Sequence, residues 1–257
     1  MYTLGIDIGS TTSKCAVIKD GKELVAHSLQ TGGLGTGGPE EAMAQLWQSY
    51  GLTRQDMACA FVTGYGRKNY EGADGEISEL TAHALGGRFV FPDLRTVIDI
   101  GGQDAKVIAL SPSGKMVNFV MNDKCAAGTG RFLDVMASIL RLDVDALDTE
   151  AAKATAPAAI SSTCTVFAES EVISQLANGV KRPDLVAGIC RSVASRVAAL
   201  ARRAGVTERV CLSGGVAQND AVRQALSDEL NVPVSVDPLA QYFGAIGAAL
   251  WAYKQQV

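Results

Sequence analysis

The sequence lacks an apolar run long enough to span a bilayer, and no basic segment followed by an apolar one stands at its start. Asp7 interrupts the first hydrophobic stretch almost at once. We therefore expect a cytoplasmic protein with no membrane contact and no secretory leader. The 23 Lys and Arg residues and 27 Asp and Glu residues give a net charge of −4 without any block of like charge. This balance argues against nucleic acid and anionic membranes as partners.

Two kinds of motif are also missing. No Gly-x-x-x-x-Gly-Lys-Ser/Thr sequence is present, which excludes a P-loop nucleotide site. The six cysteines show no paired spacing, so in a reducing compartment they are core residues, metal ligands or redox groups and not a disulfide framework. What the chain does have is 257 residues, 47% of them hydrophobic, which is enough for one large domain or two lobes.

Strand and helix signals alternate along the chain, which is typical of an α/β architecture. The expected strands cover residues 4–7, 15–18, 23–28, 58–63, 96–100, 106–110, 116–121, 209–212 and 234–236. The first expected helix begins near residue 39. The others cover residues 76–85, 130–140, 166–177, 184–204, 217–230 and 239–252. We expect the glycine pair at 86–87 to end the second of these helices.

The most informative feature is an internal repeat. Asp7-Ile8-Gly9 and Asp99-Ile100-Gly101 begin two strand clusters that lie 92 residues apart. Each is followed at the same offset by a lysine, Lys14 or Lys106, then by an apolar strand and a Gly-Lys pair. One extra residue precedes the second Gly-Lys pair. Two unrelated hairpins could share a few residues, but four matches in the same order favour a duplicated lobe.

Each repeat places an aspartate at the end of a buried strand and then a tight turn of small residues. Such a turn brings backbone N–H groups and hydroxyls to a phosphate, while the carboxylate holds hydrated Mg²⁺. The candidate groups of the first turn are Asp7 for magnesium and, for phosphate, Gly9, Ser10, Thr11, Thr12, Ser13 and Lys14. Those of the second turn are Asp99 for magnesium, Gly101, Gly102 and Gln103 for phosphate, and Gln103 or Asp104 for the attacking water. An ordinary strand-to-helix turn is the alternative for each turn taken alone.

A third element, Ser213 to Asn219, joins a strand end to a helix through a glycine pair. The missing side chains at Gly214 and Gly215 would let a nucleoside lie flat against the backbone, with Gln218 nearby. Gln241, before the last expected helix, is a further candidate nucleotide contact. In this order, the three elements resemble the actin, hexokinase and heat-shock chaperone superfamily. The resemblance implies two ribonuclease-H-like lobes, placed at residues 1–95 and 96–257, with ATP or ADP and magnesium in the cleft between them.

Two cysteines, Cys125 and Cys164, lie just ahead of expected helices, where the helix dipole favours a thiolate. Thiolates in such a setting suit a soft metal or an iron–sulfur cluster. A four-iron cluster usually takes four thiolates, which two copies of the chain would supply. The alternative is that both cysteines are small buried hydrophobes. That interpretation is preferred for the other four, Cys15, Cys59, Cys190 and Cys211.

The segments around both cysteines, together with residues 63–67 (Thr-Gly-Tyr-Gly-Arg) and 79–83 (Glu-Leu-Thr-Ala-His), resemble activators of 2-hydroxyacyl-CoA dehydratases. That family includes ATPase subunits of benzoyl-CoA reductase-type systems. Leu80 stands where isoleucine is usual. The resemblance implies an oxygen-sensitive homodimer of an anaerobe, with one [4Fe–4S] cluster ligated by Cys125 and Cys164 of each subunit. ATP binding and hydrolysis would then send one low-potential electron, received from a ferredoxin or flavodoxin, to a dehydratase or reductase that carries its own cluster.

Two other functions fit the same nucleotide-binding elements. A small-molecule kinase would use them to phosphorylate an acceptor, with a base near the acceptor hydroxyl. A non-enzymatic switch would only report the nucleotide state to a partner. Iron content and the effect of replacing Cys125 and Cys164 separate these functions from electron transfer.

Overall fold

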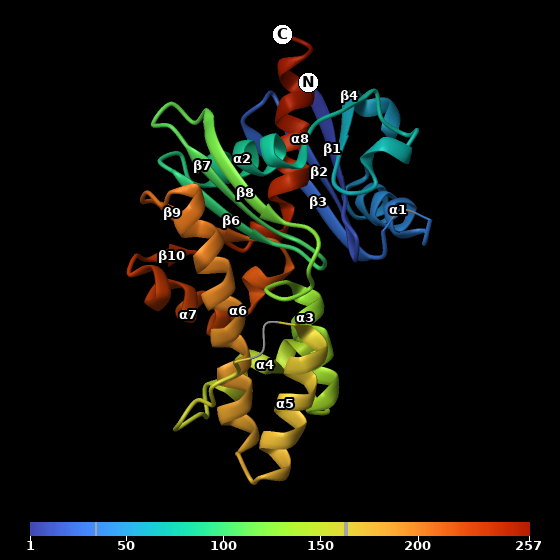
Figure 1. Ribbon diagram of the computed structural model, residues 1–257. Helices are drawn as coiled ribbons and strands as arrows, with labels where there is room; N and C mark the ends of the chain where they lie inside the picture. The colour runs from blue at the N-terminus through green and yellow to red at the C-terminus, as the bar shows by residue number, and fades with distance from the viewer. Residues whose placement is uncertain (34, 162–163) are drawn as a thin grey trace. The chain divides into compact units, whose positions relative to one another are not determined.

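The computed structural model describes residues 1–33, 35–161 and 164–257 of the chain (Figure 1). The chain divides into two compact units. Unit 1 contains Met1–Leu94, Leu110–Met116 and Asp237–Val257, and unit 2 contains Arg95–Ala109 and Val117–Val236. The predicted boundary after residue 95 lies close to the start of unit 2. The last segment, however, belongs with unit 1, because its helix packs on the unit 1 sheet.

Unit 1 is built on a five-stranded sheet of order β3-β2-β1-β4-β5. Its strands are β1 (Tyr2–Ile8), β2 (Thr12–Lys19), β3 (Glu23–Thr31), β4 (Met57–Thr63) and β5 (Gly75–Glu76). β1 pairs antiparallel with β2 and parallel with β4. Alternate residues face opposite sides of the sheet: Leu4 and Ile6 pack with α1 (Gly38–Tyr50). Gly5 faces the opposite side, against α8 (Phe243–Lys254).

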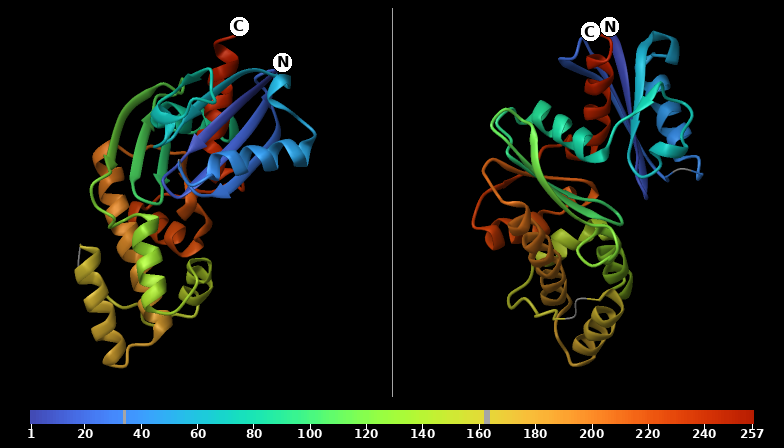
Figure 2. Two further views of the ribbon diagram at one scale, coloured as in Figure 1. Left: turned by 90° about the vertical axis from the view of Figure 1, so that its right-hand side faces the viewer. Right: turned by 45° about the horizontal axis from the view of Figure 1, so that its top comes forward.

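The helix α2 (Glu79–Val90) packs beside α8 in unit 1 (Figure 2). The expected end of this helix at the glycine pair 86–87 is wrong, because the helix continues to Val90. A side chain at Gly86 would collide with the backbone of Phe243, and one at Gly247 would collide with the backbone of Ala82. These glycines therefore allow two helices to approach closely, and Gly86 does not act as a stop signal.

Unit 2 contains a second five-stranded sheet, of order β10-β9-β6-β7-β8. Its strands are β6 (Thr96–Ile100), β7 (Ala105–Leu110), β8 (Met116–Asn122), β9 (Val210–Ser213) and β10 (Val234–Ser235). β6 pairs antiparallel with β7 and parallel with β9. The sheets of both units thus share one strand arrangement, and Asp7 pairs with Lys14 in the same register as Asp99 with Lys106. The predicted duplication is confirmed.

The helices of unit 2 are α3 (Gly130–Ile139), α4 (Leu147–Ala151), α5 (Thr165–Ala177), α6 (Arg182–Ala204) and α7 (Asp220–Leu230). Figure 1 shows α3, α4 and α5 gathered with the first half of α6 at one end of this unit, beyond its sheet. The expected single helix over 217–230 is wrong at its start. A short 3₁₀ turn, Gly215–Gln218, comes first, and the side chain of Asn219 then caps α7. The short helix α4 was not expected from the sequence.

The predicted α/β class and actin-like architecture are confirmed by two mixed sheets with helices packed on them. Among the described residues, no helix combines the length and apolar character needed to cross a bilayer.

Candidate functional site

The first glycine turn follows Asp7, near the end of β1. Asp7 is buried, and the Nζ atom of Lys14 lies 3.6 Å from its Oδ2 atom. The Gly9 N–H donates to the carbonyl oxygen of Thr12, which closes the turn at 3.0 Å. Strand β2 begins at Thr12, so Thr12, Ser13 and Lys14 lie in a strand and only residues 9–11 form the turn.

Glycines surround the Asp7 carboxylate. A side chain at Gly244 would lie 2.7 Å from Oδ2 of Asp7 and 3.2 Å from Nε2 of His83, and one at Gly64 would lie 2.5 Å from Oδ1. His83 is also buried. Thr63 pairs with Asp7 across the sheet, is fully buried, and its hydroxyl has no hydrogen-bond partner among the described residues. Three buried polar side chains, those of Asp7, Thr63 and His83, thus lie next to the first turn.

The glycine-rich segment that joins β3 to α1, residues 31–38, packs against this turn. The Gly32 N–H donates to the Thr11 carbonyl oxygen at 2.8 Å, and the Ser13 hydroxyl donates to the Gly32 carbonyl oxygen at 2.7 Å. A side chain at Gly33 would lie 2.6 Å from the Gly9 carbonyl oxygen. The described part of the segment therefore supports the turn, and the Ser13 hydroxyl is already hydrogen-bonded to a backbone oxygen of unit 1.

The second turn repeats this arrangement in unit 2. Asp99 is buried at the end of β6, and Lys106 Nζ lies 3.4 Å from its Oδ2 atom. The Ser213 hydroxyl donates to Asp99 Oδ1 at 2.8 Å. The Gly101 N–H donates to the carbonyl oxygen of Asp104 at 2.9 Å and closes the turn. The carboxylate is thus held by a cation on one side and by a hydroxyl on the other.

The two candidates for orienting water differ in their surroundings. Asp104 Oδ2 lies 2.7 Å from Lys106 Nζ, so this carboxylate is part of an ion pair. Gln103 is exposed, and within the described residues its amide makes no hydrogen bond. Gln103 therefore has the side chain that is available to a bound ligand.

The third predicted element follows β9. Gly214 has a φ of 83°, and a side chain there would lie 3.0 Å from Asp99 Oδ1 and collide with the Ile100 carbonyl oxygen. Gly215 and Gln218 are exposed on the 3₁₀ turn. Gln241 lies in unit 1, in the 3₁₀ turn before α8. Gly214 therefore brings the third element directly against the second turn.

The second turn also contacts the start of α3. The Gly130 N–H donates to the Gly101 carbonyl oxygen at 2.9 Å, and the Arg131 N–H donates to the Gly102 carbonyl oxygen at 2.8 Å. Backbone N–H groups at the beginning of a helix have no partner within the helix. Here two of them are satisfied by the turn, so α3 and the turn are directly linked.

The six cysteines fall into two classes. Four are buried, which confirms the interpretation of Cys15, Cys59, Cys190 and Cys211 as core residues. Burial raises the pKa of Cys15 and of Cys190 to about 12, and it raises the pKa values of Cys59 and Cys211 as well. Cys125 and Cys164 are exposed, so the interpretation of these two as buried hydrophobes is wrong.

Cys125 lies in a loop whose shape is fixed by Asn122. The Asn122 amide nitrogen donates to the carbonyl oxygens of Cys125 at 2.8 Å and Ala127 at 3.1 Å, and its Oδ1 accepts from the Cys125 N–H at 3.3 Å. The Thr129 N–H and hydroxyl both donate to the Ala126 carbonyl oxygen. The loop leads directly into α3.

Cys164 is the N-cap residue of α5, and its carbonyl oxygen accepts from the Ala168 N–H. Ser161, three residues before Cys164, is bound to α5: its N–H and its hydroxyl both donate to the carboxylate of Glu171. Ser162 and Thr163, which precede Cys164, lie outside the described residues. Cys164 therefore lies directly before α5, and Cys125 lies five residues before the start of α3, so both cysteines precede helices as predicted.

The donor atoms fit the groups expected from the sequence. Two exposed thiols per chain are half the usual ligand set of a four-iron cluster. Within the described ranges, no group of three or more His, Cys, Asp and Glu residues comes together in one chain. Asp7 and Asp99 offer hard oxygen atoms, which suit a hydrated magnesium ion.

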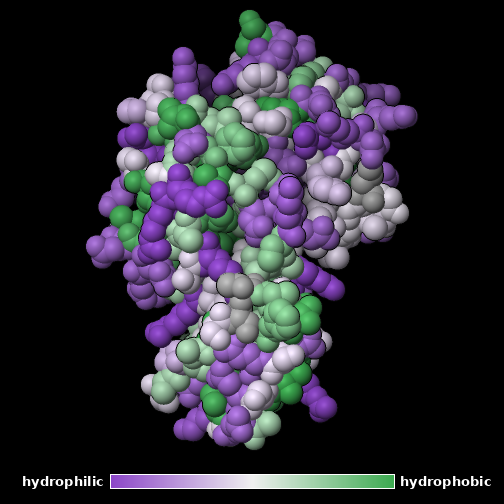
Figure 3. Space-filling view, viewed as in Figure 1, coloured by the Kyte–Doolittle hydropathy of each residue, from purple (hydrophilic) through white to green (hydrophobic). Residues whose placement is uncertain are grey.

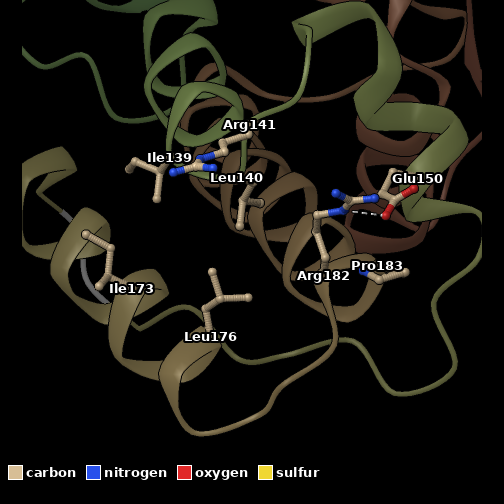
Figure 4. Close-up of a pocket in the computed structure, with 8 residues that line it drawn as sticks. All are labelled: Ile139, Leu140, Arg141, Glu150, Ile173, Leu176, Arg182 and Pro183. Carbon is tan, nitrogen blue, oxygen red and sulfur yellow. Dashed lines mark hydrogen bonds and ion pairs between the residues drawn. The ribbon is translucent and has the colours of Figure 1, made fainter.

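A groove of about 750 Å³ lies elsewhere in unit 2, between the end of α3, α5 and the start of α6 (Figure 4). Leu140, Ile173 and Leu176 give it an apolar lining, and the ion pair of Arg182 with Glu150, 2.8 Å, lies at one end. None of the predicted site residues lines it. The groove is thus separate from the glycine turns and the cysteines.

Several residues of the site were not found from the sequence. In the sequence, Ser213 stands out only as part of a glycine motif, and nothing indicates a role for Asn122. Ser213 acts through a contact with a residue distant in sequence, and Asn122 acts within an irregular loop. The signal that could have found Ser213 is its equivalence to Thr63, since each precedes a glycine with positive φ.

Comparison with known proteins gives a consistent result. The sequence pattern of the BadF/BadG/BcrA/BcrD ATPase family matches residues 4–252. The (R)-2-hydroxyglutaryl-CoA dehydratase activating ATPase of Acidaminococcus fermentans is 57% identical, over 99% of this chain and 98% of its own. The crystal structure of that dehydratase's component A has a TM-score of 0.96, with the same coverage of the two chains.

Two further structures extend the comparison. The activator of the 2-hydroxyisocaproyl-CoA dehydratase from Clostridium difficile, solved with bound ADPNP, is 51% identical with a TM-score of 0.96 and covers 99% of this chain and 95% of its own. A glucokinase of the ROK family from Streptomyces griseus is 16% identical with a TM-score of 0.59, covers 99% of this chain and 100% of its own, and shares the fold alone. The match over residues 4–252 and the high identity to dehydratase activators along almost the whole chain show that this protein belongs to the BadF/BadG/BcrA/BcrD ATPase family.

Proposed function

We propose that the protein is an ATP-dependent reductive activator. It delivers one low-potential electron at a time from a [4Fe–4S] cluster, shared by two copies of the chain, to a partner enzyme such as a 2-hydroxyacyl-CoA dehydratase. The electron comes from a carrier such as ferredoxin or flavodoxin. The names of the relatives support this proposal, since two of them are a dehydratase activating ATPase and a dehydratase activator.

In the nucleotide site, each unit contributes one glycine turn. The backbone N–H groups of Ser10 and Thr11 in the first turn and of Gly102 and Gln103 in the second bind phosphate oxygens. Asp7 and Asp99 hold the magnesium ion through water. The exposed amide of Gln103 orients the attacking water, because the Asp104 carboxylate is paired with Lys106. Gly214, Gly215, Gln218 and Gln241 contact the nucleoside.

One observation carries the coupling of ATP to the cluster: the hydrogen bonds between the second turn and the start of α3. A change in the turn on ATP binding or hydrolysis moves the Gly101 and Gly102 carbonyl oxygens. The first residues of α3 follow, and with them the loop that carries Cys125. Small shifts of this kind are amplified when a helix has two packed positions.

The surface next to Cys164 supports a cluster shared between two copies. Val166 and Phe167 are 66% and 68% exposed, although both are large and apolar. Figure 3 shows apolar groups beside hydrophilic ones at this end of unit 2. Exposed apolar patches mark interaction sites, and a second copy would cover this one while it brings two more thiols. When bound, the cluster supplies a one-electron carrier of low potential.

The proposal is tested by purification without oxygen, followed by assays of iron, sulfide and ATP hydrolysis. We expect about two irons per chain, which is one four-iron cluster for each pair of chains. Cys125→Ala and Cys164→Ala should each abolish iron binding and activation of a 2-hydroxyacyl-CoA dehydratase, with ATPase activity retained. Cys59→Ala, which removes a buried thiol in unit 1, is the matched control and should keep its iron.

A colourless protein without iron that is fully active as an ATPase would disprove the redox role. Partner activation that survives both cysteine replacements would favour a non-enzymatic switch. ATP turnover that yields one phosphorylated small molecule per ATP would support the kinase function instead.

A further inference from the structure

Arg196 lies on α6 of unit 2 and reaches the loop that carries Cys125. An ideal Cβ atom at Gly128, three residues after Cys125, would lie 3.4 Å from Cβ and 3.9 Å from Cδ of Arg196. The Arg196 side chain thus runs along the backbone of this loop. These are ordinary van der Waals distances, and the φ of 84° at Gly128 is the feature that favours glycine at this position.

The guanidinium group is held in place by an aromatic ring. Its Cζ atom lies 5.1 Å from the centroid of the Phe132 ring, which is a cation–π distance. Phe132 is fully buried in the first turns of α3, so the ring has little freedom. Arg196 itself is only partly exposed. A long side chain that is normally mobile is therefore fixed at both its stem and its head.

The charge of Arg196 acts on both exposed cysteines. Burial lowers the pKa of its guanidinium, whereas the thiol groups of Cys125 and Cys164 raise it, since a thiolate stabilises the cation. An arginine remains charged at any pH at which the protein is folded. The electrostatic influence of both cysteines, 39 residues apart in sequence, thus extends to this arginine.

We propose that Arg196 is a positioning residue for electron transfer: its fixed cation, held beside the Cys125 loop and the Phe132 ring, raises the reduction potential of the cluster that Cys125 and Cys164 bind. This inference rests on the proposed function. Reduction adds one negative charge to the cluster, and a nearby cation stabilises the reduced form.

The location of Arg196 also makes this effect sensitive to the nucleotide. The cation belongs to α6, whereas Cys125 and Phe132 belong to the segment that is hydrogen-bonded to the second glycine turn. A shift of α3 relative to α6 changes the distance between the cation and the Cys125 thiolate. The potential therefore falls when the nucleotide state moves α3 away from Arg196.

The test is a redox titration of the cluster in the anaerobically purified protein, followed by electron paramagnetic resonance. In R196Q, we expect about a tenfold increase in the ratio of oxidised to reduced cluster at a fixed potential, which is a midpoint lower by about 59 mV. R196K retains the charge and should remain closer to the parent protein. The control is R203Q, which removes an exposed arginine seven residues further along the same helix.

Iron content, ATPase activity and thermal unfolding are measured on every variant. A cluster-loaded R196Q protein with an unchanged midpoint overturns the role of Arg196 and leaves the proposed function standing. Equal shifts in R196Q and R203Q also overturn it, because the effect would then be one of net charge. R196Q could fold and yet not retain iron. In that case, iron retained by R196K supports the need for a cation at this position, whereas loss of iron from both variants overturns the proposed role of Arg196. Absence of iron from the parent protein removes the proposed function and this inference together.

Discussion

At the residue scale, the two buried aspartates differ in one contact. Ser213 and Thr63 hold equivalent positions, since each is paired with the aspartate of its unit and precedes a glycine with positive φ. Only the Ser213 hydroxyl donates to its aspartate, whereas the Thr63 hydroxyl is buried without a partner among the residues described. The two units thus share the backbone geometry around the aspartate, but only unit 2 has the hydroxyl-to-carboxylate hydrogen bond.

This difference predicts opposite behaviour of two similar substitutions. Ser213→Ala removes a hydrogen bond to a buried carboxylate and should lower the free energy of unfolding by about 2 kcal/mol. Thr63→Val removes a hydroxyl that has no partner and should change that free energy by less than about 1 kcal/mol. Urea unfolding of both variants beside the parent protein measures the effects. An equal loss in the two variants would contradict the assignment.

At the element scale, the link between the second turn and α3 makes a prediction about Gly130. A methyl group there would lie 3.2 Å from the Gly101 carbonyl oxygen, so Gly130→Ala should push α3 away from the turn by a few tenths of an ångström. The helix should not lose stability, because alanine is the better helix former. We expect ATPase activity to stay near that of the parent protein and ATP-dependent activation of the dehydratase to fall about tenfold.

Parallel assays of ATP hydrolysis and partner activation give the answer. Ser138→Ala is the control, since it changes an exposed residue of the same helix away from the turn. If activation and hydrolysis both remain normal in Gly130→Ala, the contact does not transmit the nucleotide state.

The elements also show how far the sequence could be used to predict the structure. The Asp-Lys repeat was predicted because both residues lie within one hairpin, where local spacing determines register. The glycine pair at 86–87 was misinterpreted, because its purpose is the approach of α8, more than 150 residues later in the chain. The sequence gives no sign of Arg196 for the same reason: its neighbours Gly128 and Phe132 come from another segment. Local patterns thus predicted strands, turns and the position of two cysteines ahead of helices, and long-range contacts required the structure.

At the scale of the whole molecule, the proposed cluster requires two chains, and the exposed side chain of Phe167 offers a way to test this. The residue is 68% exposed in the single chain and lies three residues after Cys164. A second copy that brings its own cysteines close would bury this ring, and burial of a phenylalanine contributes about 2 kcal/mol per copy. Because a two-fold interface uses the same patch twice, one substitution removes two rings.

Phe167→Ser should therefore raise the dissociation constant of the dimer at least about tenfold, and the iron content per chain should fall with it. Folding of the single chain should be unaffected, since the ring is exposed there. Tyr50→Ser, which changes a 44% exposed residue at the end of α1 in unit 1, is the matched control. Sedimentation at several concentrations, with iron assayed in each fraction, separates the outcomes. A Phe167→Ser protein that dimerises as tightly as its parent would show that this surface is not the one shared by two copies, and iron retained in its monomers would show that the cluster needs no second chain.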